Sequence, residues 1–592
     1  MKKTLFSFFL LCIASALGAG VVLSSCNRED VITADVAPSI DFGESGGVYT
    51  ARACRPLTIA PDYSHNLGAD YCWEFDGEVI ATTPTLTWQW EETGSYYLML
   101  TVANDAGSAR AEIRVDVVEN GTPVISLPIA GDNVMVALGT DYVIAPEISN
   151  STLEGFACSI SIDGHEVATE PTYIFSASAT GDYLVEIEAS NTDGSDRREF
   201  TITVVESLPY ELTFPTPSYF QTSTTRYTFA GRPVCLTPLV ENLEVTDIVW
   251  SVNGVRADCS ELTFLFTPDK AGEYIVGITV NGSASASVKV VCVDVTEQQR
   301  NRKPSGSSSA RCVNVFEWVP APGQFIGETK TGGMTGNETT PEAANSWARR
   351  RLEEQKYVSL GGFGGYIIVG FDHSIQRVEG DYDFAVMANA FLNAATGAGG
   401  SNEPGIVYVM QDVNGNGLPD DEWYELRGSE TSVASTRSDY AVTYYRPSGP
   451  KMNVQWTDNY GVSGTIDYLA AFHQQDYYYP AWIEADSYTL RGTCLEARTT
   501  QDPSTGMWDN SAYSWGYADN MGGDNLTGSD AVTGEGQRNG FLIENAMLPN
   551  RQAIKLEYVD FVKIQTGVNS KAGWLGEVST EVFDVEDLHL SK

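Results

Sequence analysis

The chain has 592 residues, a formal net charge of −42 at pH 7, 42% hydrophobic residues and 11% aromatic residues. The negative charge excludes an electrostatic interface for nucleic-acid phosphates or anionic lipids, so we expect no nucleic-acid partner. The composition indicates a globular protein, and the length predicts roughly three to five domains.

Residues 1–25 have the pattern of a secretory signal peptide. Lys2 and Lys3 precede an apolar run over residues 5–22, which is too short for a transmembrane helix. Leu23, two serines and Cys26 follow. This order resembles the lipobox of bacterial lipoproteins, which implies that the Cys26 thiol is diacylglycerated and anchors the chain in a membrane. The alternative is a plain signal peptide in which this cysteine occurs by chance.

Residues 26–35 are interpreted as an anchor and surface-export segment. Glu29 and Asp30 follow Cys26 closely. They look like the short acidic signal that sends some Gram-negative lipoproteins to the outer face of the outer membrane. We therefore expect a lipid-anchored protein that faces the cell exterior, and the alternative is a lipoprotein that faces the periplasm.

Ten cysteines are present. Cys12 leaves with the signal peptide and Cys26 carries lipid, so eight remain in a chain that crosses the oxidising periplasm. We expect buried thiols with one or two disulfides. No spacing of cysteine and histidine indicates zinc.

A repeat occupies the first half of the chain. A Gly-x-Tyr motif occurs at residues 94–96, 181–183 and 272–274, with glycines 87 and 91 residues apart. Each motif precedes an alternating strand-like run. An Asp-Gly or Asn-Gly pair lies upstream of each copy and predicts a tight hairpin turn, because these residues tolerate positive φ. These pairs lie at residues 76–77, 163–164 and 253–254.

Three immunoglobulin-like β-sandwiches are therefore predicted, over residues 36–119, 120–206 and 207–297. The Gly-x-Tyr motif resembles that of the polycystic-kidney-disease (PKD) domain family. We interpret the three sandwiches as spacers. The hydroxyl group of the tyrosine in each motif is expected to form a hydrogen bond to the backbone.

A polar, Ser-rich stretch over residues 298–310 is predicted to be a flexible linker. Residues 311–592 contain no repeat and are predicted to form a larger, jelly-roll-like β-sandwich head. Its one helix is expected over residues 342–355, with Thr340 as cap and Pro341 at the first position. Strands are predicted at residues 366–371, 383–388, 405–410, 440–445, 488–490, 558–565 and 578–585.

An acidic and amide-rich segment begins at Asp412. Oxygen-bearing side chains stand at positions 1, 3, 5 and 9, and Gly417 stands at position 6, as in the first part of an EF-hand-type calcium loop. Position 12 is Trp423, which departs from that pattern. The alternative is a polar turn without metal. The predicted ligands of a structural calcium ion are Asp412, Asn414, Asn416, Asp420 and Glu422.

Two clusters of aromatic and amide side chains, over residues 476–482 and 508–520, suit a sugar or a corrin ring with its fringe of amides. The alternative is that these rings fill the core of the head. The predicted ligand-binding residues are Tyr478, Tyr479, Trp482, Arg491, Trp508, Trp515, Asn520 and Trp574.

Catalytic patterns are weak. Asp372, His373 and Ser374 are adjacent in sequence, but neighbours on a strand point to opposite faces and so do not form a triad. Carboxylate pairs suited to a glycosidase arise by chance in a chain this acidic. We expect no enzymatic activity.

Four stretches of the head carry a resemblance to a known family: residues 360–374, 403–412, 423–426 and 573–582. They are similar to PKD-containing cell-surface lipoproteins of gut Gram-negative anaerobes. That resemblance suggests the cobalamin-binding surface lipoproteins that accompany a TonB-dependent transporter, and it implies that this chain binds cobalamin and passes it to the transporter. We expect residues 311–592 to bind alone, with the sandwiches dispensable. A calcium-dependent glycan-binding module, a glycoside hydrolase and an adhesive protein are the alternatives.

Overall fold

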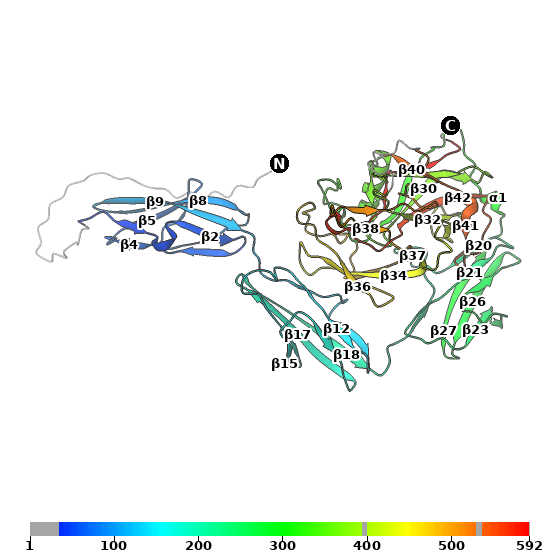
Figure 1. The fold of residues 1–592 in the computed structure, drawn as a ribbon, viewed down its shortest axis with the longest axis horizontal. Coiled ribbons are helices and arrows are strands. Elements are labelled where there is room, and N and C mark those ends of the chain that lie inside the picture. The colour runs from blue at the N-terminus through cyan, green and yellow to red at the C-terminus, as the bar shows by residue number, and fades with distance from the viewer. Residues whose placement is uncertain (1–34, 394–398, 528–535, 591–592) are drawn as a thin grey trace, which may run out of the picture. The chain divides into compact units, whose positions relative to one another are not determined.

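The computed structural model describes residues 35–393, 399–527 and 536–590. The predicted signal peptide and Cys26 lie outside these residues. The chain is mostly β-structure and divides into two compact units, residues 1–121 and 122–592 (Figure 1). No helix in the described part of the chain is long and apolar enough to span a membrane.

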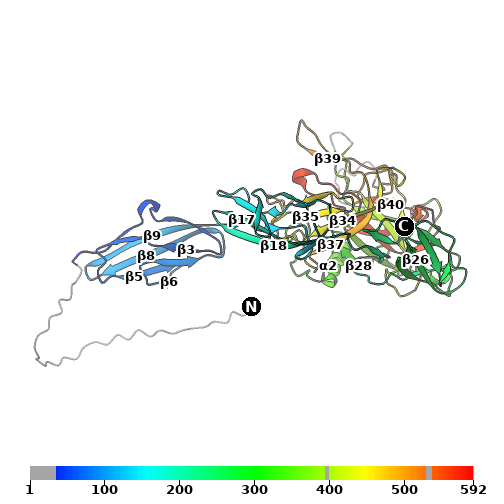
Figure 2. The same cartoon turned by 90° about the horizontal axis from the view of Figure 1, so that it is seen from below.

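The first unit holds one β-sandwich. Its five-stranded sheet has the order β2-β9-β8-β5-β6, and the pairs β3–β7 and β1–β4 complete it. Figure 2 shows β9, β8, β5 and β6 of this sheet together with β3. A short 3-10 helix, η1 (Gly43–Ser45), follows the first strand. The strands are β1 (Ser39–Asp41), β2 (Val48–Arg52), β3 (Pro56–Ile59), β4 (Asp62–Ser64), β5 (Asp70–Phe75), β6 (Glu78–Ala81), β7 (Leu86–Gln89), β8 (Gly94–Asn104) and β9 (Gly107–Val118).

The second sandwich opens the second unit and repeats this strand order as β11-β18-β17-β14-β15. As in the first sandwich, the edge strand pairs in parallel with the last strand. Its strands are β10 (Ile125–Ser126), β11 (Asn133–Ala137), β12 (Tyr142–Ile144), β13 (Glu147–Ile148), β14 (Ala157–Ile162), β15 (His165–Ala168), β16 (Tyr173–Phe175), β17 (Gly181–Asn191) and β18 (Gly194–Val205).

The third sandwich has the same arrangement, β20-β27-β26-β23-β24, again with a parallel edge pair. Its strands are β19 (Glu211–Thr213), β20 (Arg226–Thr228), β21 (Val234–Leu236), β22 (Leu239–Glu241), β23 (Ile248–Val252), β24 (Val255–Arg256), β25 (Phe264–Phe266), β26 (Gly272–Val280) and β27 (Ala284–Cys292).

The repeated turns and tyrosines have the predicted roles. Asp76, Asp163 and Asn253 have φ of 50°, 49° and 49°, and each is followed by a glycine with positive φ. This is the backbone of a type I′ hairpin turn. The repeated tyrosines donate hydroxyl hydrogen bonds to the carbonyl four residues earlier, at 2.8–3.0 Å. Both predictions are therefore confirmed.

The head is built from antiparallel sheets around one large core. A six-stranded sheet has the order β28-β30-β42-β32-β33-β41, a four-stranded sheet β36-β35-β34-β37 and a three-stranded sheet β40-β31-β44. Strands of these sheets are β28 (Asn314–Val319), β30 (Tyr366–Gln376), β31 (Phe384–Ala388), β32 (Gly405–Met410), β33 (Tyr424–Leu426), β34 (Arg437–Tyr445), β35 (Val454–Asp458), β36 (Ser463–Ile466), β37 (Ser487–Cys494), β40 (Gln537–Phe541), β41 (Ala546–Met547), β42 (Tyr558–Thr566) and β44 (Asp584–Asp587).

Shorter elements complete the head. The pairs β29 (Val358–Ser359) with β43 (Glu581–Val582), and β38 (Thr499–Gln501) with β39 (Trp508–Asn510), form two further ribbons. The 3-10 helices are η3 (Ile543–Asn545) and η4 (Gly573–Leu575).

The predicted helix is α2 (Pro341–Glu353). Thr340 accepts a hydrogen bond from the Ala343 N–H, and Pro341 occupies the first turn, as expected. The helix buries Trp347, which stacks on Trp318 at 4.9 Å between ring centroids. A second, short helix, α1 (Glu297–Arg300), was not predicted.

Two further expectations are wrong, one about the cysteines and one about the linker. The eight cysteines in the described residues are all free, so the predicted disulfides are absent among them. The stretch 298–310 is held against the head, because Arg302 forms an ion pair with Asp560 and Arg300 bonds to two backbone carbonyls. Its polar composition reflects these contacts as well as solvent exposure.

Candidate functional site

The aromatic residues predicted at 476–482 are core residues. Tyr478, Tyr479 and Trp482 are 1%, 2% and 1% exposed. Their polar atoms bond to backbone carbonyls, and the Trp482 ring lies 4.7 Å from the ring of Trp318. Buried tyrosine and tryptophan require such partners. The prediction that these three contact a ligand is therefore wrong: they are buried in the core, and Trp482 joins this loop to β28.

Arg491 and Asn520 also have structural roles. Arg491 forms an ion pair of 2.7 Å with Glu241 of the third sandwich. Asn520 is fully buried, and its amide exchanges two hydrogen bonds with the backbone of Tyr513. Asn520 thus fixes the loop of the second aromatic cluster and does not line an exposed face.

Trp508 and Trp574 lie together at the surface, with two residues that the sequence did not single out. We define the aromatic patch as Phe472, Trp508, Trp574 and Leu575. Phe472 and Trp574 are 57% and 47% exposed, with ring centroids 6.3 Å apart. The Trp508 indole lies against the backbone of Gly573, where a Cβ would be 2.5 Å from its Nε1. Phe472 carries no sequence signal, because only the fold brings its loop to η4.

A cavity of about 290 Å³ adjoins the aromatic patch at Phe472. Lys330, Gln474 and Gln475 are among its lining residues. Gln475 donates to the carbonyls of Gln324 and Ile326, while its Oε1 is buried with no hydrogen-bond partner in the described structure. The cavity is thus lined by polar side chains, which include Glu328 and two glutamines, beside the exposed ring of Phe472.

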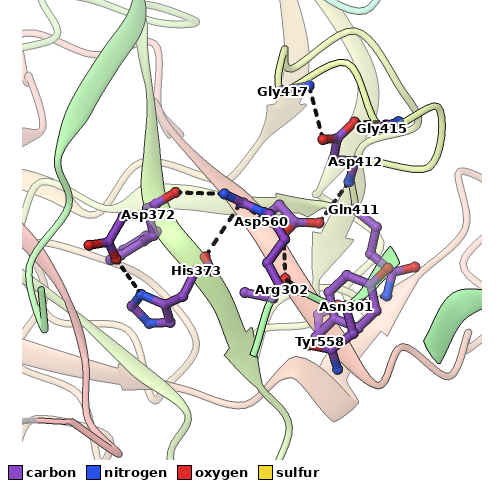
Figure 3. A network of polar contacts seen from close by, with 12 residues as sticks. Asn301, Arg302, Asp372, His373, Gln411, Asp412, Gly415, Gly417, Tyr558 and Asp560 are labelled. Atoms are coloured by element: carbon purple, nitrogen blue, oxygen red, sulfur yellow. Dashed lines mark hydrogen bonds and ion pairs between the residues drawn. The ribbon is translucent and has the colours of Figure 1, made fainter. Parts of the chain in front are cut away.

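The loop after β32 folds as a compact turn around Asp412. The Asp412 carboxylate accepts hydrogen bonds from the backbone N–H groups of Gly415, Asn416 and Gly417, at 2.8–3.0 Å (Figure 3). The Asn414 and Asn416 amides both donate to Asp420 at 2.9 Å. Four of the five predicted calcium ligands therefore lie in one cluster.

The fifth predicted ligand, Glu422, points elsewhere. Its Oε1 lies 2.7 Å from Arg226 Nε of the third sandwich, and both side chains are largely buried. Asp421, and not Glu422, contacts the loop. Its Oδ2 accepts from the Val413 N–H, and its Oδ1 is buried without a hydrogen-bond partner in the described structure. Burial, with Asp420 and Asp412 nearby, raises the pKa of Asp421. The prediction that Glu422 binds calcium is therefore wrong, because its carboxylate pairs with Arg226.

The Asp412 loop is tied to the core by Asp560 of β42. Asp560 accepts from the Asp412 N–H, from the Ser374 hydroxyl and from Arg302 (Figure 3). Because Ser374 donates to Asp560, it does not pair with His373. The two ring nitrogens of His373 instead lie 2.8 and 2.9 Å from carboxylate oxygens of Asp372 and Asp587. Asp372, His373 and Ser374 therefore do not form a catalytic triad.

Glu403, Asp519 and Glu581 form a second acidic cluster, with one carboxylate oxygen of each within 4.8 Å of the others. The Asp519 carboxylate accepts from the Glu581 N–H at 3.0 Å and from the Asn389 N–H at 3.3 Å. Burial raises the pKa of all three carboxyls, and repulsion from Glu581 raises the pKa of Glu403 and of Asp519 further. Such a cluster retains protons or holds a hard cation. No sequence motif marked it, because the three residues come from separate segments.

A PKD-like domain model matches residues 37–104 and 122–191, in the first and second sandwiches. The chain therefore carries PKD-like domains. No curated protein matches the chain.

Solved structures with tandem domains are also similar. The I-band fragment I67–I69 from titin is 16% identical over 44% of this chain and 98% of its own, with a TM-score of 0.20. Fibronectin(III)-like modules of Clostridium thermocellum CbhA are 15% identical over 28% and 93%, with a TM-score of 0.18. The eight N-terminal Ig domains of Down Syndrome Cell Adhesion Molecule are 14% identical over 60% and 41%, with a TM-score of 0.19.

The third sandwich, which shares the strand order of the PKD-like domains, packs against the head near β41 and β42 (Figure 1). Besides Arg226–Glu422, the Ser218 hydroxyl donates to Glu317 at 2.6 Å. Cys235 belongs to the core cluster of the head. The expectation that all three sandwiches are dispensable spacers is therefore wrong for the third, since buried charges of the head depend on it.

Proposed function

We propose that this protein is a non-catalytic lipoprotein, anchored through Cys26 to the outer face of the outer membrane. It captures cobalamin and passes it to a TonB-dependent transporter. The observation that carries the proposal is the aromatic patch beside a polar cavity whose lining includes Lys330, Gln474 and Gln475. The resemblance of the head to cobalamin-binding surface lipoproteins supports the same ligand.

A corrin ring presents broad apolar faces and a fringe of amides. Phe472 and Trp574 provide flat, exposed surface at low cost in side-chain entropy. The exposed Gln474 amide oxygen can accept from a ligand amide, and Lys330 can donate to a ligand carbonyl. Binding of this kind needs shape and hydrogen bonds but no bond-breaking chemistry.

Tethering gives the captured vitamin a high effective concentration at the transporter. The PKD-like domains would hold the head away from the membrane. The net charge of −42 keeps the protein from lying on an anionic lipid surface.

A calcium ion in the Asp412 loop is part of the proposal. It would take oxygens from Asp412, Asn414, Asn416 and Asp420, and the unpartnered Oδ1 of Asp421 can replace the missing carboxylate of position 12. The ion would stabilise the loop and, through Asp560, the sheet below it.

The test is a calorimetric titration of the mature chain with cyanocobalamin. We expect binding of one ligand per chain, and affinity at least about tenfold lower in Trp574→Ala and in Phe472→Ala. Tyr460→Ala is the control, because Tyr460 is an exposed aromatic residue of the head outside the patch. Absence of binding by the folded native chain, or heat with neutral oligosaccharides instead, would overturn the proposal.

A further inference from the structure

A largely apolar cavity of the head shares no lining residue with the aromatic patch. Its volume is about 410 Å³, within the range of roughly 300–1,000 Å³ typical of small-molecule sites. It lies between the end of β33, the loop at residues 514–516 and β40. Residues that give it chemical character include Arg427, Ser514, Trp515, Asp524 and Asn545.

Arg427 is the distinctive residue of this cavity. Its backbone N–H bonds to the Asn545 carbonyl at 2.9 Å, which fixes the position of its Cα. Within residues 35–393, 399–527 and 536–590, its guanidinium has no ion pair, hydrogen bond or ring contact. Arginine presents a planar fork of donors that matches a carboxylate, so an unpaired arginine in a cavity favours an anionic group.

The acid in the same cavity does not neutralise Arg427. Asp524 is 4% exposed, and its two oxygens accept from the Gly516 N–H at 2.6 Å and from the Asn539 amide at 3.2 Å. Within the described residues Asp524 forms no ion pair with Arg427, and burial raises the pKa of its carboxyl. Asp524 therefore holds the loop in place, and the arginine remains available.

Trp515 supplies a flat wall. Its side chain is 38% exposed, and its carbonyl accepts from the Ser429 N–H at 2.9 Å. The following Gly516 has a φ of 91°, and a Cβ there would lie 2.4 Å from the Cα of Gly428. The backbone beside Trp515 is thus closely packed, so the wall exists before a ligand binds.

We infer that this cavity binds a sugar ring that bears a carboxylate, such as a uronic acid or sialic acid residue. The ring stacks on Trp515 and the carboxylate pairs with Arg427. Ser514 and Asn545 offer a hydroxyl and an amide to the sugar hydroxyls. This site is separate from the aromatic patch, and the inference does not depend on cobalamin binding.

The test uses ligand-observed NMR and calorimetry on the mature chain. The probes are glucuronate, galacturonate and N-acetylneuraminate, with glucose and galactose as neutral controls and benzoate as a carboxylate on an aromatic ring. We expect at least one sugar acid to bind about tenfold or more tightly than its neutral counterpart, because a charge-assisted hydrogen bond is lost with the carboxylate.

Arg427→Gln should weaken binding of the sugar acid by about tenfold or more, and Trp515→Ala should do the same. Trp574→Ala should leave it unchanged, and unchanged thermal melting of Arg427→Gln will show that the variant is folded. Equal binding of neutral and acidic sugars, preference for benzoate, or no binding of any probe would overturn the inference.

Discussion

Arg302 and Asp560 form an ion pair of 2.9 Å, in which Asp560 is almost fully buried and Arg302 is partly exposed. The pair joins the segment between the third sandwich and the head to the middle of the six-stranded sheet. Asp560 also accepts from the Asp412 N–H, so one carboxylate holds both the connecting segment and the candidate calcium loop.

Arg302→Leu should destabilise the head by about 1–3 kcal/mol, because it leaves the Asp560 charge buried with only neutral donors. Lys303→Ala is the matched control. The Lys303 amine bonds to Gln376 at the surface, so we expect a change within about 0.5 kcal/mol. Chemical denaturation of both variants measures the difference, and equal values would contradict the structural role of the pair.

A fragment of residues 311–592 should fold poorly, whereas residues 207–592 should be stable. The shorter fragment removes Arg226 and leaves Glu422 buried without its partner. It also exposes the face that packs on Cys235. Limited proteolysis and thermal melting of the two fragments will test this. If 311–592 melts as cooperatively and at the same temperature as 207–592, the third sandwich is a spacer after all.

Calcium should raise the Tm of the mature chain by a few degrees at saturating concentration, and a chelator should reverse the shift. Asp412→Ala should remove the part of the shift that comes from the loop. Asp502→Ala, in the exposed turn between β38 and β39, is the control. Any shift that remains in Asp412→Ala would come from Glu403, Asp519 and Glu581. The same shift in all three proteins would exclude calcium from the loop.

Glu577 makes the stability of the head depend on pH. Burial, with Glu581 and Asp467 nearby, raises its pKa from about 4.5 to about 8. The native state therefore binds this proton more tightly than the unfolded chain does, so the stabilisation is complete below pH 4.5 and is lost as the pH rises towards 8.

Glu577→Gln should flatten that dependence, since the amide stays neutral. At pH 8 the variant should be more stable than the native chain, by on the order of 1–3 kcal/mol. Melting temperatures of both proteins from pH 4.5 to pH 8 provide the measurement. Parallel curves would show that Glu577 does not titrate in this range.

Trp482→Ala should lower the stability of the head, whereas Trp574→Ala should lower cobalamin binding. Trp482 is buried against Trp318, so its loss should cost about 3–5 kcal/mol of stability. Trp574 is half exposed, so its loss should change stability by less than about 0.5 kcal/mol and should affect cobalamin binding alone. Denaturation and titration of both variants will separate the core role from the binding role.

Local patterns determined the sandwiches and the Asp412 loop. The Asp-Gly and Asn-Gly turns, the repeated Gly-x-Tyr motif and the alternating strands are specified by neighbouring residues. Backbone sterics fix the turns, and the repeated tyrosines bond to carbonyls four residues away, so both are visible locally. The same holds for α2, whose cap and first-turn proline are adjacent to it in sequence. The oxygen spacing after Asp412 placed four side chains in one turn for the same reason.

Only the tertiary structure decided which aromatic residues are exposed. The sequence predicted both Tyr478 and Trp574 as ligand-binding residues, yet Tyr478 is buried in the core and Trp574 lies in the aromatic patch. Arg226 of the third sandwich reaches Glu422 across 196 positions of the chain and removes it from the loop. Burial and ion pairs of this kind depend on packing between distant segments, and no local pattern in the sequence encodes which segments will meet.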